Sequence, residues 1–229
     1  LKNSQNYFFV KGSITDKKLM SKLINDCDVV INFAAESHVD RSISNPKPFI
    51  DSNILGVFNI LEIIKKQKKR LLHVSTDEVF GSLKTISANE EYRLNPSSPY
   101  SASKASAELL INSYVRTFEI NSVITRCTNN YGPKQFPEKL IPKTIILASR
   151  NEKIPIYGTG KSIRDWIFVD DHCDAIMDVL LNGKSGESYN ISAGNEIDNI
   201  TIIKKILTII GKPLENIEFV EDRPGHDFR

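Results

Sequence analysis

Two adjacent carboxylates, Asp77 and Glu78, follow a threonine in the segment STDEVFG at residues 75–81. The segment comes directly after the apolar run LLHV, so these side chains stand at the end of a predicted buried strand. Neighbouring carboxyls can divide the roles of acid and base when their environments separate their pKa values. Ser75 and Glu78 also match the S-x-x-E capping box of a helix start, so a purely local role is equally open.

A tyrosine and a lysine lie four residues apart in PYSASKASAE, near a predicted helix start. At this spacing Tyr100 and Lys104 project from one helix face. An ammonium beside a phenol favours the phenolate, so we expect Lys104 to lower the pKa of Tyr100 and make it a general base. The pattern is common on helices, and an exposed surface pair is the alternative.

The stretch NFAAESHVDRSIS follows another predicted strand, where α/β folds place cofactor and substrate. His38 and Asp40 could suggest a metal, but two ligands without partners do not make a site, and we predict none. Ala34 and Ala35 are small enough to let a flat cofactor ring approach closely.

Further along the chain, amide and guanidinium groups suggest a binding site for a polar ligand. Asn129 and Asn130 precede a Gly-Pro turn, although such a composition is also typical of plain turns. Arg164 and Arg223 carry groups suited to phosphate oxygens. Arg164 could equally form an ion pair with the following Asp165.

Apolar runs and helical patterns alternate around these residues. The predicted strands are continuous apolar runs at 7–10, 28–35, 70–76 and 122–126, as in a parallel sheet covered on both faces. Predicted helices cover 16–25, 48–66 and 99–119. This alternation predicts an α/β fold with a Rossmann-like, doubly wound parallel sheet.

After residue 130 the alternation loosens, and a helix in EKLIPKTIILASR is expected to be interrupted by Pro142. We therefore predict a partial dinucleotide-binding domain over residues 1–130. Residues 131–229 mainly form a smaller C-terminal substrate-binding lobe, with segments that return to the main sheet.

Composition excludes several functional classes. The chain has 229 residues, 40% hydrophobic and 25% charged, with a net charge of +2, which gives no reason to expect nucleic acid or membrane as partners. Cys27, Cys127 and Cys173 show no metal-binding or redox spacing, so reduced thiols and a cytoplasmic location are expected. No apolar stretch is long enough to span a bilayer.

Together the motifs resemble the extended short-chain dehydrogenase/reductase superfamily, and within it the dTDP-glucose 4,6-dehydratase family. The stretches that carry the resemblance are AAESHVDRSI, STDEVFG, YSASKA, RCTNNYGP, FPEKLIP, RDWIFVDDH and DRPGHD. The Asp-Glu pair is the specific part, because epimerases of the superfamily usually show a serine pair and decarboxylases typically lack the aspartate.

The resemblance implies NAD-dependent dehydration of dTDP-glucose to the 4-keto-6-deoxy sugar, as in deoxysugar biosynthesis. Tyr100, assisted by Lys104, would take the proton of the sugar 4-hydroxyl while hydride leaves C4 for NAD. Glu78 would then remove the C5 proton, and Asp77 would protonate the departing 6-hydroxyl. Thr76 would bind the 4-oxygen. Both carboxylates can serve one sugar only if the chain leaves the strand there, because adjacent strand residues face opposite sides.

The resemblance also implies binding residues and a homodimer, paired through the helix at 48–66 and the Tyr100 helix into a four-helix interface. Cofactor contacts would come from Ser13, Ile14, Phe33, Ala34, Ala35, Glu36, Ser37, Ser52, Tyr100, Lys104 and Asn130. Substrate contacts would come from Ser37, Thr76, Asn129, Lys139, Leu140, Pro155, Ile156, Tyr157, Arg164, Asn195, Asp222, Arg223, Pro224, Gly225 and His226. Pro155 to Tyr157 could instead be only an edge strand.

The sequence departs from the family in having no G-x-x-G-x-x-G motif, which holds the cofactor pyrophosphate in the first βαβ portion. That portion is missing, and we expect about sixty further N-terminal residues in the natural polypeptide. Ser13 replaces a frequent aspartate that reaches the adenine. A non-catalytic remnant therefore stays open, as does another NAD-dependent nucleotide-sugar enzyme: a UDP-glucuronate decarboxylase or a UDP- or CDP-sugar dehydratase.

Overall fold

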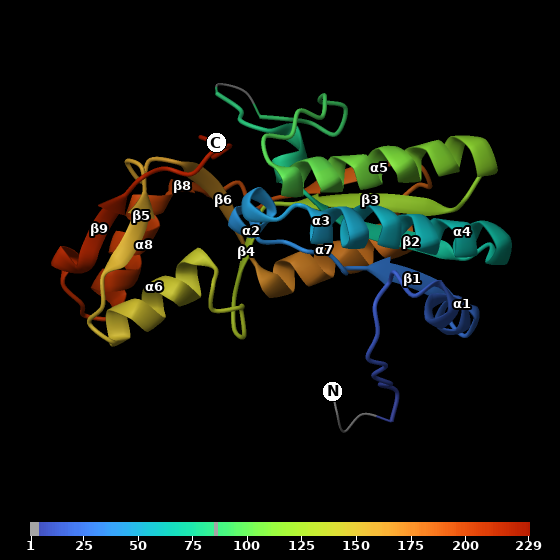
Figure 1. The fold of residues 1–229 in the computed structure, drawn as a ribbon, viewed down its shortest axis with the longest axis horizontal. Coiled ribbons are helices and arrows are strands. Elements are labelled where there is room, and N and C mark those ends of the chain that lie inside the picture. Colours follow the sequence, from blue (N-terminus) through green and yellow to red (C-terminus); the bar gives the residue numbers. More distant parts are fainter. Residues whose placement is uncertain (1–4, 85–86) are drawn as a thin grey trace.

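The computed structural model describes residues 5–84 and 87–229. The molecule is elongated, with a main sheet and its helices at one end and a smaller group of strands and helices at the other (Figure 1). The main sheet has four parallel strands in the order β1-β2-β3-β7. They are β1 (Val29–Asn32), β2 (Arg70–Thr76), β3 (Ser122–Cys127) and β7 (Ser188–Ile191). This confirms the predicted parallel α/β architecture.

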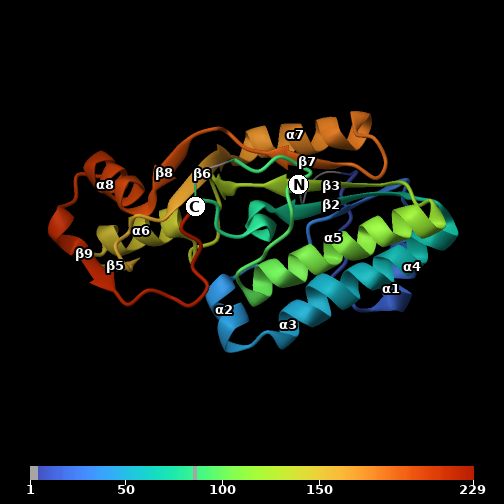
Figure 2. The same cartoon turned by 90° about the horizontal axis from the view of Figure 1, so that it is seen from above.

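Helices cover both faces of this sheet (Figure 2). One face carries α1 (Lys17–Asn25), α4 (Val57–Gln67) and α5 (Pro99–Phe118), and the opposite face carries α7 (Val169–Asn182). Leu61, Ile64 and Ile111 are fully buried in the first layer, while Leu72 and Ile176 are buried in the second. This explains why the strands are continuous apolar runs in the sequence: both faces of each strand lie in a core.

The predicted helix at 48–66 is built from consecutive pieces. Short helices α2 (Val39–Ser44) and α3 (Lys47–Phe49) lead into the π-helix η1 (Ile50–Gly56), which continues as α4. A Cβ at Gly56 would lie 2.4 Å from the Ile14 side chain, so only glycine lets η1 approach that residue without displacing it. The apolar periodicity of a helix does not reveal a π-helical turn, which often lies beside a functional site.

The smaller part has its own sheets and core. One sheet joins β4 (Asn129–Tyr131), β6 (Ile163–Phe168) and β8 (Glu196–Asp198), and β5 (Ile154–Tyr157) pairs with β9 (Ile217–Val220). Helices α6 (Leu140–Ser149) and α8 (Asn199–Ile209) pack on them through Ile154, Ile203 and Leu207. A 3-10 turn, η3 (Leu214–Asn216), precedes β9. Between these elements β7 returns to pair with β3.

Two expectations about these elements were wrong. Residues 7–10 form no strand: they pair with no strand of the sheet, and the outer edge of β1 also stays unpaired among the described residues. Pro142 does not interrupt α6 but lies in its first turn, where its missing N–H has no intrahelical acceptor to lose. Within the described ranges, no helix combines the length and apolar character that crossing a membrane requires.

Candidate active site

The chain turns sharply where the main sheet presents its carboxylates. Thr76 ends β2 in an extended conformation, and the 3-10 helix η2 (Asp77–Phe80) follows at once. Thr76 Oγ1 accepts a hydrogen bond from the Glu78 N–H at 3.2 Å, so Thr76 is the N-cap. The predicted Ser75–Glu78 box was therefore wrong by one residue. Ser75 Oγ is buried without a partner within the described structure.

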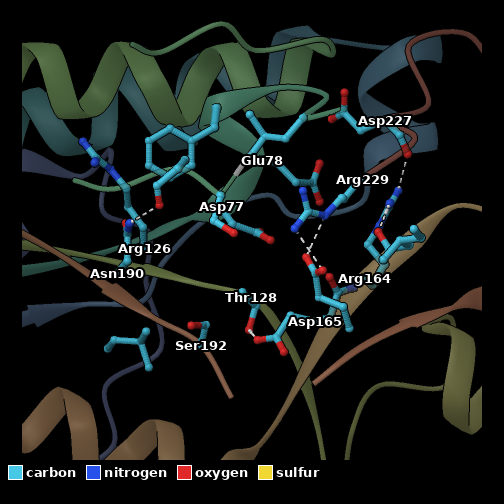
Figure 3. A pocket seen from close by; sticks show the side chains of 18 of the residues that line it. Asp77, Glu78, Arg126, Thr128, Arg164, Asp165, Asn190, Ser192, Asp227 and Arg229 are labelled. Carbon is cyan, nitrogen blue, oxygen red and sulfur yellow. Dashed lines mark hydrogen bonds and ion pairs between the residues drawn. The ribbon is translucent and has the colours of Figure 1, made fainter. Parts of the chain in front are cut away.

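This turn brings both carboxylates to one cavity of about 520 Å³, although they are adjacent in sequence. Figure 3 shows Asp77 and Glu78 on one wall, with Arg164 and Asp227 near them. Withdrawal from water and the Glu78 charge together raise the pKa of Asp77 to about 7. Burial also raises the pKa of Glu78, against the positive charge of Arg164. Asp77 can thus hold a proton near neutral pH, as an acid must.

Tyr100 and Lys104 come from the start of α5, which is firmly anchored. Ser98 caps the helix in a reciprocal capping box with Ser101, and Pro99 occupies its first turn. Both side chains are buried, Tyr100 with 9% and Lys104 with 3% of its surface exposed. They are therefore not the exposed surface pair that the spacing alone allowed.

Lys104 does not act on Tyr100 as expected. Its Nζ donates to Val74 O at 2.6 Å and lies 3.3 Å from His73 Nε2. Burial lowers the pKa of Lys104 to about 8, although the Glu108 carboxylate acts in the opposite direction. Burial and the Glu78 charge raise the pKa of Tyr100 well above its usual value, while a hydrogen bond with Thr76 acts to lower it. The expected lowering of the Tyr100 pKa by Lys104 was therefore wrong.

A second cavity of about 200 Å³ meets the first at Glu78, Asn129 and Arg164, which line both. Most predicted substrate-binding residues line it: Ser37, Asn129, Lys139, Leu140, Pro155, Ile156, Tyr157, Arg164, Arg223 and His226. Pro155 to Tyr157 thus belong both to strand β5 and to the cavity wall. Arg164, Arg223 and Lys139 give this cavity a positive character that suits an anion.

Asp40 links two of these residues across the smaller cavity. It accepts hydrogen bonds from Arg223 Nη1 at 2.8 Å and from the Tyr157 hydroxyl at 3.1 Å. Although burial acts in the other direction, these bonds lower the pKa of Asp40 and keep it ionised. Lys139 Nζ donates to Ser37 O at 3.2 Å on the same side. The α2 region is thereby fixed to the smaller part of the molecule.

The DRPGHD loop carries the remaining predicted substrate contacts. Asp222 pairs with His226 Nδ1 at 2.7 Å and also accepts the Arg223 N–H. Gly225 has a φ of 65°, and a Cβ there would lie 2.5 Å from Ser97 O. Pro224, between Arg223 and Gly225 in the sequence, lines neither cavity. The glycine thus lets the loop pass close to the start of α5.

The predicted cofactor residues lie around the carboxyl ends of the strands, with exceptions. Phe33, Ala34, Ala35, Glu36 and Ser37 follow β1, Ser52 lies in η1, and Asn130 lies in β4. Ser13 and Ile14 lie before α1: Ser13 is exposed and bonds Thr15, and Ile14 packs into the core. Asn195 is exposed and lines neither cavity; its N–H donates to Asp165.

Several residues that support the site were not found from sequence. Asn32 Nδ2 contacts His73 Nδ1 at 3.1 Å, which places this histidine between Asn32 and Lys104. Asn53 exchanges hydrogen bonds with the backbone of Glu36 and also donates to Ser103. The sequence does hold one signal for them: each is a polar residue inside an apolar strand or helix. Such side chains are buried only when they are hydrogen-bonded, so each should have a polar partner.

Arg164 and Asp165 do not pair with each other, contrary to the alternative interpretation. Arg164 donates to Ile163 O and Asp227 O, and its charge faces Asp77 and Glu78. Asp165 accepts from the Thr128 hydroxyl and the Ala193 N–H, both at 2.8 Å. Arg164 is thus left to act in the site, while Asp165 organises the loop after β7.

The residues present fit a dinucleotide and give no sign of a metal site. Asn130 Oδ1 is buried with no partner among the described residues, and Lys104 is held at the end of the sheet. Ala34 is exposed and Ala35 half-buried directly after β1, and their small side chains permit the close approach of a flat ring. Across residues 5–84 and 87–229, histidine, cysteine, aspartate and glutamate form no group that could hold a metal.

A protein-family model and several known proteins are similar to this chain over almost all of its length. A family model described as GDP-mannose 4,6 dehydratase matches residues 1–228. The low-salt glycan biosynthesis protein Agl12 of Haloferax volcanii is 47% identical over 225 residues, which covers 98% of this chain and 73% of that protein. A dTDP-glucose 4,6-dehydratase of Xanthomonas campestris pv. campestris is 44% identical over 251 residues, covering 100% of this chain and 72% of the relative.

A solved structure is also similar over almost the whole chain. It is DesIV, a dTDP-glucose 4,6-dehydratase from Streptomyces venezuelae with NAD bound. The TM-score is 0.97 at 41% sequence identity, and the similarity covers 99% of this chain and 70% of that one. The fold is therefore shared, over almost the whole chain, with a dTDP-glucose 4,6-dehydratase that has NAD bound.

Proposed function

The chain belongs to the GDP-mannose 4,6-dehydratase family, and we propose that it is a hydro-lyase for dTDP-glucose. It uses NAD to convert this substrate to dTDP-4-keto-6-deoxyglucose with loss of water. One observation carries the proposal: Asp77 and Glu78 share a cavity with Arg164, and both carboxyls lie close enough to the buried Tyr100 for their charges to raise its pKa.

The acid and base roles follow from the environments of the two carboxyls. Asp77, with its pKa raised to about 7, holds the proton that the departing 6-hydroxyl needs. Glu78 is the C5 base, because the Arg164 and Arg223 charges favour its ionised form against burial. It returns its proton to C5, since the product again carries hydrogen there. Arg164 also opposes the repulsion between the two carboxyls.

Tyr100 takes the proton of the sugar 4-hydroxyl, and Thr76 orients the 4-oxygen. Bound NAD supplies the hydride acceptor for C4, the hydride donor for C6, and a positive ring charge that favours the Tyr100 phenolate. Lys104 is held by Val74 O and His73, so its ammonium is fixed for contact with the cofactor. The cofactor is held by the residues after β1 together with Ser52, Tyr100, Lys104 and Asn130.

The smaller cavity binds the nucleotide diphosphate. Arg223 and Lys139 supply charge for the phosphates, and Arg164 stands at its junction with the sugar cavity. Asp40 holds the Arg223 guanidinium in a fixed orientation. Leu140, Ile156 and Ile203 provide an apolar wall suited to the nucleoside.

We also propose a homodimer in the cytoplasm. Helices α4 and α5 lie side by side; Phe58 on α4 and Leu109 on α5 are exposed by 39% and 61%, and Leu55 in the preceding η1 by 49%. Two such faces would pair into a four-helix interface that removes these apolar side chains from water. The cysteines of the described chain are free thiols, which suits a reducing compartment.

The test is a mass-spectrometric assay of the full-length gene product with NAD. The substrates are dTDP-glucose, UDP-glucose, CDP-glucose and UDP-glucuronate in one mixture. We expect loss of one water from dTDP-glucose alone. Loss of carbon dioxide from UDP-glucuronate would instead identify a decarboxylase, and water loss from another sugar would change the base preference. No change in any substrate, from folded protein that retains NAD, would refute the catalytic proposal.

A further inference from the structure

A chain of buried polar side chains runs beneath the site, from β1 through β2 to α5. Asn32 Nδ2 lies 3.1 Å from His73 Nδ1, and His73 Nε2 lies 3.3 Å from Lys104 Nζ. The three residues are exposed by only 4%, 1% and 3%. Polar atoms this deeply buried need hydrogen-bond partners, so each contact should join a donor to an acceptor. The protons in the chain can therefore be placed from the partners at its two ends.

Asn32 determines which nitrogen of the His73 ring carries the proton. Asn32 Oδ1 accepts the Ala34 N–H at 3.1 Å, so the amide group turns its Nδ2 toward the ring. An amide nitrogen only donates, so His73 Nδ1 is the acceptor. Burial lowers the pKa of His73 well below its usual value, and the Lys104 charge acts in the same direction, so the ring is neutral. Its single proton therefore lies on Nε2, which faces Lys104.

A ring N–H at this position does not suit an ammonium group. An ammonium has three donors and no acceptor, whereas an amine keeps a lone pair that can accept the His73 Nε2–H. Lys104 Nζ also donates to Val74 O at 2.6 Å, a bond that both forms can make. The contacts of Nζ are thus satisfied in the amine, while the ammonium meets the ring donor to donor.

The ammonium can be accommodated only at the cost of another buried hydrogen bond. If the ring proton moved to Nδ1, it would meet the amide nitrogen of Asn32, and turning that amide would deprive the Ala34 N–H of its acceptor. Two further titratable groups face Lys104: Glu108 on its own helix, whose charge favours the ammonium, and the Cys127 thiol on β3, whose pKa burial raises to about 12. Burial has the largest effect and lowers the pKa of Lys104 to about 8.

We propose that Asn32 and His73 hold a ring N–H against Lys104 and thereby set the alkaline limit of the C4 oxidation, an inference that rests on the proposed dehydratase function. The ammonium is the form that the proposed cofactor contact uses. Above the limit Lys104 gives its proton to solvent and becomes an amine that accepts the His73 Nε2–H. Asn32 and His73 line neither cavity, so they are positioning residues that act through Lys104.

The first measurement is the tautomer of His73, which needs no reaction. In NMR spectra of the full-length gene product with NAD, labelled with ¹⁵N in its histidine rings, protonated and unprotonated ring nitrogens give separate resonances. We expect His73 to carry its proton on Nε2, and this resonance to move as Lys104 titrates near pH 8. His73→Phe assigns the signals by removing them. Lys104→Met, which keeps an unbranched side chain, should abolish the movement.

The second measurement is the pH dependence of C4 oxidation, followed by NADH absorbance after mixing with dTDP-glucose. The Asp77→Asn background is used because it slows the loss of water, so that NADH accumulates. The oxidation rate should fall as pH rises through about 8. In Asn32→Asp both side-chain oxygens accept, so the ring proton moves to Nδ1 and Nε2 accepts from the ammonium. Removing the donor-to-donor contact should raise the alkaline limit by about one to two pH units.

A control separates the ring proton from the added charge. Asn32→Asp also brings a carboxylate near Lys104, so the same change is made together with His73→Phe, where the shift should be clearly smaller. A His73 proton on Nδ1 in the wild type, an alkaline limit that Asn32→Asp leaves in place, or an equal shift without the ring would overturn the proposal. If Asn32→Asp does not fold, the wild-type tautomer and its titration decide alone. Absence of NADH after mixing with dTDP-glucose would instead refute the proposed function.

Discussion

Removing the carboxylate of Glu108 should strongly lower the free energy of unfolding, although Glu108 lines neither cavity of the site. Glu108 on α5 and Arg126 on β3 form an ion pair in which their side chains are exposed by 0% and 5%. Arg126 Nη2 and Nε donate to Glu108 Oε2 at 2.8 and 3.0 Å. In Glu108→Ala the guanidinium stays buried, and among the described residues it keeps Glu90 O at 2.9 Å and the Phe80 ring as partners.

The expected loss follows from that isolated charge. Breaking a buried ion pair on one side costs about 3–5 kcal/mol, because the remaining charge keeps its desolvation penalty. Arg41→Ala is the matched control, since Arg41 pairs with Glu138 while its own side chain is 63% exposed. Exposed pairs of this kind contribute about 0–1 kcal/mol.

Urea unfolding of the full-length gene product, without NAD or substrate, measures both free energies. Omitting ligands matters because binding to the folded state adds its own stabilisation. Replacing both partners, as Glu108→Leu with Arg126→Met, should recover most of the loss, because no unpaired charge then remains. A loss below about 1 kcal/mol in Glu108→Ala, or a double variant no more stable than the single one, would refute the reasoning.

Further outcomes test the site and the assembly. The pKa of Asp77 is about 7 in the folded chain against 3.8 ordinarily, so folding stability should fall between these pH values as pH rises. Dehydration in the proposed mechanism needs protonated Asp77, so its rate should fall as pH rises through about 7. In Asp77→Asn, neither the thermal stability nor the slow residual rate should change with pH in this way. Arg223→Ala should raise KM by about 10- to 100-fold with a smaller change in kcat, as for loss of one charged hydrogen bond. Phe58→Glu should shift a sedimentation profile from dimer to monomer, whereas a dimer that persists would contradict the proposed interface.

The fold was largely predictable because its strands carry their own signal. Runs such as RLLHVST and SVITR are apolar on both faces, and both became central strands of the sheet. The strand expected at 7–10 did not form, because apolar character alone does not make a strand: a strand also needs a partner to hydrogen-bond, and within the described ranges residues 7–10 have none. The π-helix before α4 left no mark in the apolar spacing.

Parts of the site were less accessible from sequence because they depend on contacts between distant segments. His73 lies in an apolar run, and only the structure shows it between Asn32 and Lys104. The sign of the Tyr100 pKa shift was wrong because spacing on a helix places Lys104 on the same face but does not fix where its Nζ points. It points to Val74 O, and the burial of the phenol then dominates.

In the turn after β2, Thr76 combines a capping hydrogen bond with a contact to the proposed acid Asp77. The Glu78 N–H needs an acceptor where the strand ends, and Thr76 supplies it. That bond uses one lone pair of the hydroxyl and directs its proton toward Asp77, so the local demand of the backbone orients a group in the site. The same turn places both carboxyls on one wall, which an extended strand cannot do. Replacing Thr76 by a residue that caps but lacks this hydroxyl geometry, such as Asp, should therefore preserve the turn and abolish catalysis.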